Sequence, residues 1–117
     1  MVNISNEKGS ILISNDVFTW LAGDAATRCF GVKGMAGLAK DSGLVQLLRR
    51  TDMTKGVTVT TDEEGGVSIS LHIVVDHGIN MAAVCESIRR EVSYKVSSST
   101  NVPVRRVDVY IDSITMD

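Results

Sequence analysis

The stretch from Val57 to Ile111, VTVTTDEEGGVSISLHIVVDHGINMAAVCESIRREVSYKVSSSTNVPVRRVDVYI, decides the fold of this 117-residue chain. It opens with two runs of alternating residues, Val57–Thr61 and Val67–Val75. Both runs predict strands, because successive side chains of a strand point to opposite faces of a sheet. The glycines of the Asp-Glu-Glu-Gly-Gly segment between them suit a tight turn. The sequence therefore predicts an antiparallel hairpin with one face in the core and the other in water.

A helix and a last strand complete this stretch. Gly78 permits a turn, and Asn80 can cap a helix because its side-chain oxygen accepts a hydrogen bond from a free amide. The helix is predicted to run to about Ser97, where Pro103 and the residues before it end it. Its apolar residues, three and four positions apart, form one stripe for the core: Met81, Val84, Cys85, Ile88, Val92 and Val96. Val104–Ile111 then returns as a strand with alternating inward valine and isoleucine residues.

The N-terminal half is expected to add a short strand at Ile11–Ile13 and a first helix from the cap at residues 14–16 to about Cys29. Residues 31–37 carry three glycines at a spacing of three, which predicts an irregular bend. Residues 43–50 are predicted to form a short helix. Residues 1–117 should thus form a single α+β domain, with a mainly antiparallel sheet of about four strands and two principal helices packed on one face.

Composition narrows the possible functions. The net charge of -2 and the isoelectric point near 5.6 give no global positive field of the kind that attracts nucleic acid. The apolar runs are far shorter than the roughly 20 residues that a membrane span needs. The first residues do not have the charged region followed by an apolar region that is typical of a signal peptide. Both cysteines lie on the predicted apolar faces of helices. We therefore expect a cytoplasmic protein that reaches a membrane only through a partner.

Five segments in order resemble the alkaline shock protein family of bacterial cell-envelope stress proteins. They are Gly31-Val32-Lys33-Gly34-Met35-Ala36, Lys55-Gly56-Val57-Thr58-Val59, residues 67–75, His77-Gly78-Ile79-Asn80 and Val107-Asp108-Val109-Tyr110-Ile111. The resemblance implies a small cytoplasmic protein, of a kind found mostly in Gram-positive bacteria, without an established catalytic activity. Some family members associate with a membrane-anchored partner, self-associate or are linked to fatty-acid metabolism, so the resemblance implies an interaction protein. Two departures, Met81-Ala82 at the helix start and Cys85, leave the subfamily open.

A KH-like domain that binds single-stranded nucleic acid is the alternative. The Gly31-Val32-Lys33-Gly34 segment matches the GxxG loop with which such domains hold nucleotides, and the predicted order of elements fits. Gly31, Lys33 and Gly34 would carry that function. Against it, glycines interrupt the helix that should follow, and the surrounding residues are not basic.

The sequence assigns no catalytic residue, cofactor or metal. Cys29 and Cys85 lack the close spacing of zinc ligands, and a thiol on an apolar stripe ordinarily behaves as a small hydrophobic group. His72 projects from the predicted wet face and His77 lies in a turn. A hydrolytic triad is disfavoured because no G-x-S-x-G segment occurs. The acidic residues 62–64 lack the ligand pattern of a calcium loop and are interpreted as a solvated hairpin tip.

The wet face of the sheet is the predicted site of protein contact. By alternation it should carry Thr58, Thr60, Ser68, Ser70, His72, Val74, Arg106, Asp108 and Tyr110. His72, Arg106, Asp108 and Tyr110 are the contact candidates, for a protein partner or a second copy of the chain, because no predicted helix covers them. The remaining interpretation is a solvated face with cross-strand charge pairs.

Overall fold

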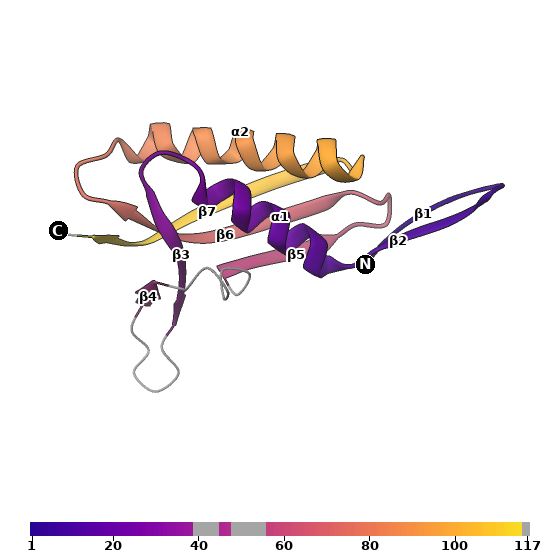
Figure 1. Cartoon of the computed structure of the whole chain (residues 1–117), viewed down its shortest axis with the longest axis horizontal. Coiled ribbons are helices and arrows are strands. Elements are labelled where there is room, and N and C mark those ends of the chain that lie inside the picture. The colour runs from indigo at the N-terminus through magenta and orange to yellow at the C-terminus, as the bar shows by residue number, and fades with distance from the viewer. Residues whose placement is uncertain (39–44, 48–55, 116–117) are drawn as a thin grey trace.

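The computed structural model describes residues 1–38, 45–47 and 56–115, and within them it contains two helices and seven strands (Figure 1). In chain order these are β1 (Val2–Asn6), β2 (Gly9–Ile13), α1 (Asn15–Thr27), β3 (Val32–Leu38), β4 (Val45–Leu47), β5 (Val57–Thr61), β6 (Val67–Asp76), α2 (Met81–Thr100) and β7 (Val104–Thr115). The predicted α+β class is confirmed.

Strand β6 is the centre of the main sheet. Its Val67–Leu71 half pairs with β5, and its Ile73–Val75 end pairs with β3, both antiparallel. Strand β7 pairs with β6 in parallel along its length. Because β7 occupies one edge of β6, β5 and β3 share the other edge end to end. Strand β4 adds an antiparallel pair to β3, so the sheet is mainly antiparallel, as predicted.

The parallel pairing of β6 and β7 follows from the helix between them. A parallel neighbour requires a crossover connection, and α2 supplies it. The cap predicted at Asn80 is present, because its side-chain oxygen accepts a hydrogen bond from the Ala83 amide at 3.1 Å. The helix ends at Thr100, three residues beyond the prediction. Hydroxyl groups of Ser97 and Thr100 donate to carbonyl oxygens one turn back, which lets these polar residues stay helical.

The core lies between the sheet and the two helices, which pack on the same side of it (Figure 1). On β6 the predicted alternation holds, since every inward residue is 0% or 1% exposed: Val67, Ile69, Leu71, Ile73 and Val75. Helix α2 contributes Val84, Ile88, Val92 and Val96, and α1 contributes Phe18, Ala22, Ala25 and Ala26. The helical stripe predicted for α2 is confirmed at these four positions, whereas Met81 is 39% exposed.

Two predictions for the connecting region are wrong. Residues 32–38 form strand β3 instead of an irregular bend, with a bulge between Val32 and Gly34. Gly31 enters this strand with a φ of 89°, and a Cβ atom there would lie 3.0 Å from the side chain of Val84. Gly31 thus serves a turn and a close contact between α2 and the start of β3. Residues 45–47 form β4 instead of helix, and the rest of the predicted helix over 43–50 lies outside the described residues.

A second small sheet is formed by the N-terminal hairpin. The sequence predicted only a strand at Ile11–Ile13, yet β1 pairs with β2 over their whole length. The hairpin projects from the body of the molecule (Figure 1). Val2 at its base is 3% exposed, whereas Ile11 and Leu12 are each 61% exposed.

Candidate protein-contact face

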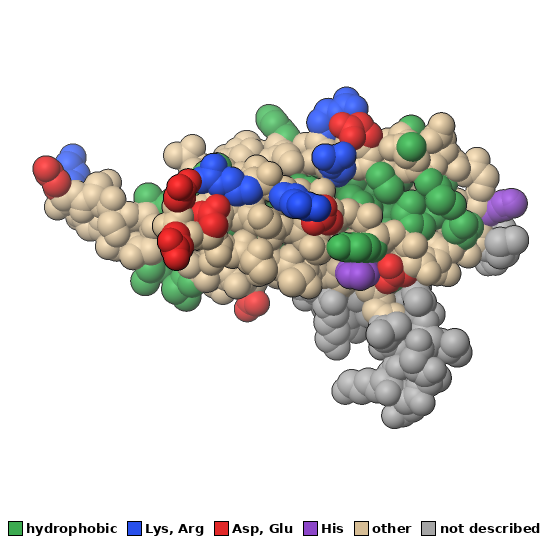
Figure 2. Space-filling model, turned by 180° about the vertical axis from the view of Figure 1, so that it is seen from behind, with side chains coloured by type: hydrophobic (Ala, Val, Ile, Leu, Met, Phe, Trp, Pro, Cys, Tyr) green, Lys and Arg blue, Asp and Glu red, His purple; other side chains and the backbone are tan. Residues whose placement is uncertain are grey.

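The pairing of β6 with β7 brings the predicted contact residues together. Ser68 lies beside Arg106, Ser70 beside Asp108, and His72 beside Tyr110. Strand β5 continues the face with threonines, because Thr58 pairs with Ser70 and Thr60 with Ser68. Figure 2 shows the side of the molecule turned away from α1, where charged side chains of both signs and a histidine are interspersed. We call the set His72, Arg106, Asp108, Tyr110 and Asp112 the contact face.

An ordered aromatic pair lies at the centre of this face. The rings of His72 and Tyr110 stack with centroids 4.8 Å apart and planes at 11°. Nδ1 of His72 lies 3.0 Å from a carboxylate oxygen of Asp112. The His72 side chain is 42% exposed, and Tyr110 is 49% exposed. The pair is therefore both fixed in position and accessible.

Asp112 is the member of the face that sequence reasoning missed. The last strand was predicted to end at Ile111, but β7 continues to Thr115. The register changes from Ile73 beside Ile111 to Val74 beside Ser113, so Asp112 is the extra residue of a bulge. The alternation of 106, 108 and 110 continues to 112, and this spacing could have identified it.

A charge pair lies next to the aromatic pair. Nε of Arg106 donates to both carboxylate oxygens of Asp108 at 2.9 Å. This hydrogen bond and the negative charge of Asp108 raise the pKa of the Arg106 guanidinium above its ordinary value. The Arg106 side chain is 73% exposed, so the pair is open to solvent. Val74, predicted on the same face, is only 4% exposed and does not extend the accessible surface.

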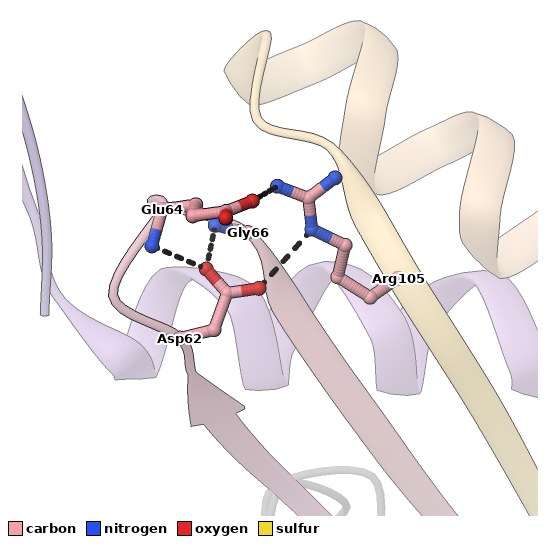
Figure 3. Close-up of polar contacts among 4 residues, drawn as sticks. All are labelled: Asp62, Glu64, Gly66 and Arg105. Carbon is pink, nitrogen blue, oxygen red and sulfur yellow. Dashed lines mark hydrogen bonds and ion pairs between the residues drawn. The ribbon is translucent and has the colours of Figure 1, made fainter.

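The acidic hairpin tip between β5 and β6 is held by backbone amides and one arginine (Figure 3). One carboxylate oxygen of Asp62 accepts from the amides of Glu64 and Gly66, and the other accepts from Nε of Arg105 at 3.1 Å. The Gly66 bond is the main cause of a lowered pKa of Asp62. Glu64 adds an ion pair with Arg105 at 3.6 Å. The hairpin tip is thus linked to the start of β7 through Arg105. Among the described residues, no cluster of histidine, cysteine, aspartate and glutamate side chains could hold a metal ion.

The two thiols are partly buried, in place of the full burial that the apolar stripes predicted. Cys29 donates to the carbonyl of Ala25 at 3.4 Å, and neither thiol forms a disulfide. Burial raises the pKa of both thiols, so at neutral pH they are protonated. His77, predicted in a turn, is exposed between β6 and α2.

The geometry expected for the KH-like alternative is not formed. A GxxG loop of that kind lies between two helices, whereas here Gly31 ends a turn after α1 and Lys33 and Gly34 already belong to β3. The Gly31 carbonyl accepts from the amide of Asp76 at 2.9 Å, which fixes the segment to β6. Lys33 is exposed on this strand.

Across the described part of the chain, neither helix has the length and apolar character needed to cross a membrane. No solved structure matches the chain.

Comparison with known proteins places the sequence among bacterial relatives of similar length. It is 30% identical to the uncharacterized protein YloU of Bacillus subtilis (strain 168), over 97% of this chain and 94% of that protein. It is 32% identical to the uncharacterized protein Spy1614 of Streptococcus pyogenes serotype M6, over 97% and 93% of the two chains. Residues 3–116 match a family described by a cell envelope-related function. The chain therefore belongs to the alkaline shock protein 23 family, as its ordered set of turns and strands indicates.

Proposed function

We propose that this protein is a non-catalytic adaptor of the bacterial cell envelope that acts by binding a protein partner through the contact face. The observation that carries the proposal is the exposed stack of His72 on Tyr110 beside a hydrogen-bonded Arg106. Tyrosine and arginine are enriched among the residues that dominate binding energies at protein interfaces. The family's cell envelope-related function supports the cellular setting.

The arrangement of the face lowers the cost of binding. Tyr110 is held by its stack and Arg106 by its two bonds to Asp108, so less side-chain freedom is lost when a partner binds. Small serine and threonine residues surround these side chains on β5 and β6, which allows a partner surface to approach closely. This arrangement supports the proposal of an interface centred on Tyr110 and Arg106.

The proposed location is the cytoplasm, with recruitment to the membrane through an anchored partner in envelope stress or lipid metabolism. In this proposal the partner supplies the attachment to the membrane, and the contact face supplies the attachment to the partner. The proposal assigns no catalytic residue, cofactor or metal to the chain, and its action requires only protein contacts.

The test is partner capture from the native host with membranes retained, followed by affinity measurement with the captured protein. Tyr110→Ala and Arg106→Ala should each weaken binding by more than ~1 kcal/mol, and both should fold normally because both side chains are exposed. Tyr94→Ala is the matched control, since this tyrosine is 70% exposed on α2, away from the contact face. Full retention of the partner by both face variants would contradict the proposal.

Lys33→Ala separates the adaptor from the nucleic-acid alternative. It should leave protein binding unchanged, because Lys33 lies on β3 and outside the contact face. If it abolished an RNA complex that also weakened steeply with salt, while the face variants kept every partner, the KH-like alternative would replace the adaptor.

A further inference from the structure

Strand β7 has an open edge beside helix α2. Among the described residues β7 pairs only with β6, so its other edge presents backbone amides and carbonyls without a strand beside them. A groove of about 440 Å³ lies along this strand, lined by Cys85 and Arg89 of α2 and by residues 105–109 of β7. The groove thus combines a strand that can form hydrogen bonds with a wall made of helix.

One row of side chains on α2 follows the groove. Met81, Cys85 and Arg89 are four residues apart, so they lie on one side of the helix. Four residues of helix rise about 6 Å, nearly the length of two strand residues at about 3.3 Å each. Because α2 is the crossover between two parallel strands, it runs opposite to β7. Arg89 therefore lies towards the start of β7, and Met81 lies towards its end.

The groove is basic where β7 begins. Among the described residues that line it, three are arginines, at 89, 105 and 106, and Asp108 is the one carboxylate. A guanidinium has five N–H donors, and Arg89 uses only Nη1, in an exposed bond of 3.3 Å to Glu86. Such exposed pairs contribute little to stability. Arg106 likewise binds Asp108 through Nε alone. Donors therefore remain for the carboxylate of a bound ligand.

The surface beside the groove is apolar towards the end of β7. Val109 and Ile111 pack against the core, yet both stay partly exposed at the edge of the sheet. Met81 on α2 is 39% exposed. Figure 2 shows this side of the molecule, where hydrophobic side chains gather next to side chains of Lys and Arg. A ligand that covers the whole edge must therefore be apolar along most of its length and anionic at one end.

An extended peptide matches the edge better than an anionic amphiphile does. Two bulges, at Arg105 and Asp112, leave the register with β6 regular only over residues 106–111. The backbone of this stretch needs a row of donors and acceptors, which an added strand supplies. A fatty acid has one anionic group and no such row, so it would satisfy only the arginines.

We propose that this groove binds an extended segment of another protein, which pairs with residues 106–111 of β7 as an added strand. The segment carries an acidic residue that meets Arg89, and small apolar residues that pack against Cys85 and Val109. This inference goes beyond the proposed function, because the groove lies at the edge of the sheet whereas the contact face lies on its outer surface. It does not depend on the stacked ring of Tyr110.

Selection from a random peptide library displayed on phage, with the purified full chain immobilised, provides the test. The wild-type protein should enrich peptides that combine alternating apolar residues with an acidic residue. Arg89→Glu should instead enrich peptides that carry a basic residue at that position. Arg90→Glu is the matched control, since Arg90 is exposed on the same helix, does not line the groove and changes the charge by the same amount. Tyr110→Ala should select the same peptides as wild type, which separates this site from the contact face.

Fluorescence polarisation with a selected acidic peptide, made synthetically, then tests the mode of binding. Arg89→Glu should weaken the complex roughly tenfold, and Arg90→Glu less than about twofold. N-methylation of one alternate set of peptide amides should abolish binding and that of the other set should not, because only one set faces β7. Circular dichroism checks that each variant is folded.

Four outcomes would overturn the proposal. They are the absence of any enriched peptide, enrichment that Arg89→Glu does not change, equal loss of binding from both N-methylated sets, and preferential binding of a different occupant. The last is measured with dodecanoate, an anionic amphiphile without a peptide backbone, and with a peptide that has the sequence of residues 104–115 of this chain.

Discussion

Replacing Ile88 by alanine tests how α2 is packed against the sheet. Ile88 is fully buried in the middle of the helix, in the same core as Leu71 and Ile73. The substitution removes three carbon atoms from this core. At about 0.8 kcal/mol for each, the lost burial is ~2.4 kcal/mol. The cavity that remains adds about 1 kcal/mol, so the free energy of unfolding should fall by ~3 to 4 kcal/mol.

Urea denaturation followed by far-ultraviolet circular dichroism measures this change. With a slope of about 1.5 kcal/mol per molar urea, the unfolding midpoint should fall by roughly 2 M. Tyr94→Ala on the same helix is the control, and it should change stability by less than about 0.5 kcal/mol because Tyr94 is exposed. An Ile88→Ala midpoint equal to that of wild type would refute the packing of α2 described above.

Three further predictions concern the thiols, the hairpin tip and the turn after α1. Replacing Cys29 and Cys85 by alanine should cost about 1 kcal/mol or less at each site in denaturation and leave partner capture intact, because both thiols are partly buried and protonated. Asp62→Asn should destabilise the protein at neutral pH. Folding lowers the pKa of Asp62, so the stability that its ionised carboxylate contributes is present above the unfolded pKa near 3.8 and is lost as pH falls. The difference in unfolding free energy between wild type and Asp62→Asn should therefore shrink in acid. A difference that does not change with pH would contradict this. Gly31→Ala should cost roughly 1–3 kcal/mol in thermal unfolding, and more than Gly65→Ala, which has a similar positive φ but nothing within 4 Å of the added Cβ; equal costs would show that crowding against α2 is unimportant.

The elements with a clear period could be predicted from sequence. The β5–β6 hairpin and α2 follow from strict alternation and from a stripe of three and four, because burial on one face imposes these periods. The shared face of His72, Arg106, Asp108 and Tyr110 follows from the same alternation. Their use in binding stays a prediction.

The strands between α1 and β5 could not be predicted, because glycines interrupt the alternation of inward and outward side chains that marks a strand. Gly34 and Gly37 have no side chain to alternate, so β3 gave no signal of inward and outward residues. The apolar residues around Val45 recur at a spacing that is typical of a helix, although residues 45–47 pair with β3 as a strand. The contact of His72 with Asp112 was missed because the last strand was predicted to end at Ile111, although the alternation of 106, 108 and 110 continues to 112.

The parallel partner of β6 has a consequence for how the chain acquires its structure. His72 and Asp112 are forty residues apart in the chain, and all of α2 lies between the two strands that carry them. Contacts of such long sequence separation are slow to form, because the intervening segment must first be closed into a loop. During synthesis the β5–β6 hairpin therefore emerges before α2 can cover its apolar face, and the second edge of β6 is paired only after β7 has left the ribosome. We expect the nascent chain to bind chaperones in this interval, and the commitment to the native state to coincide with the docking of β7.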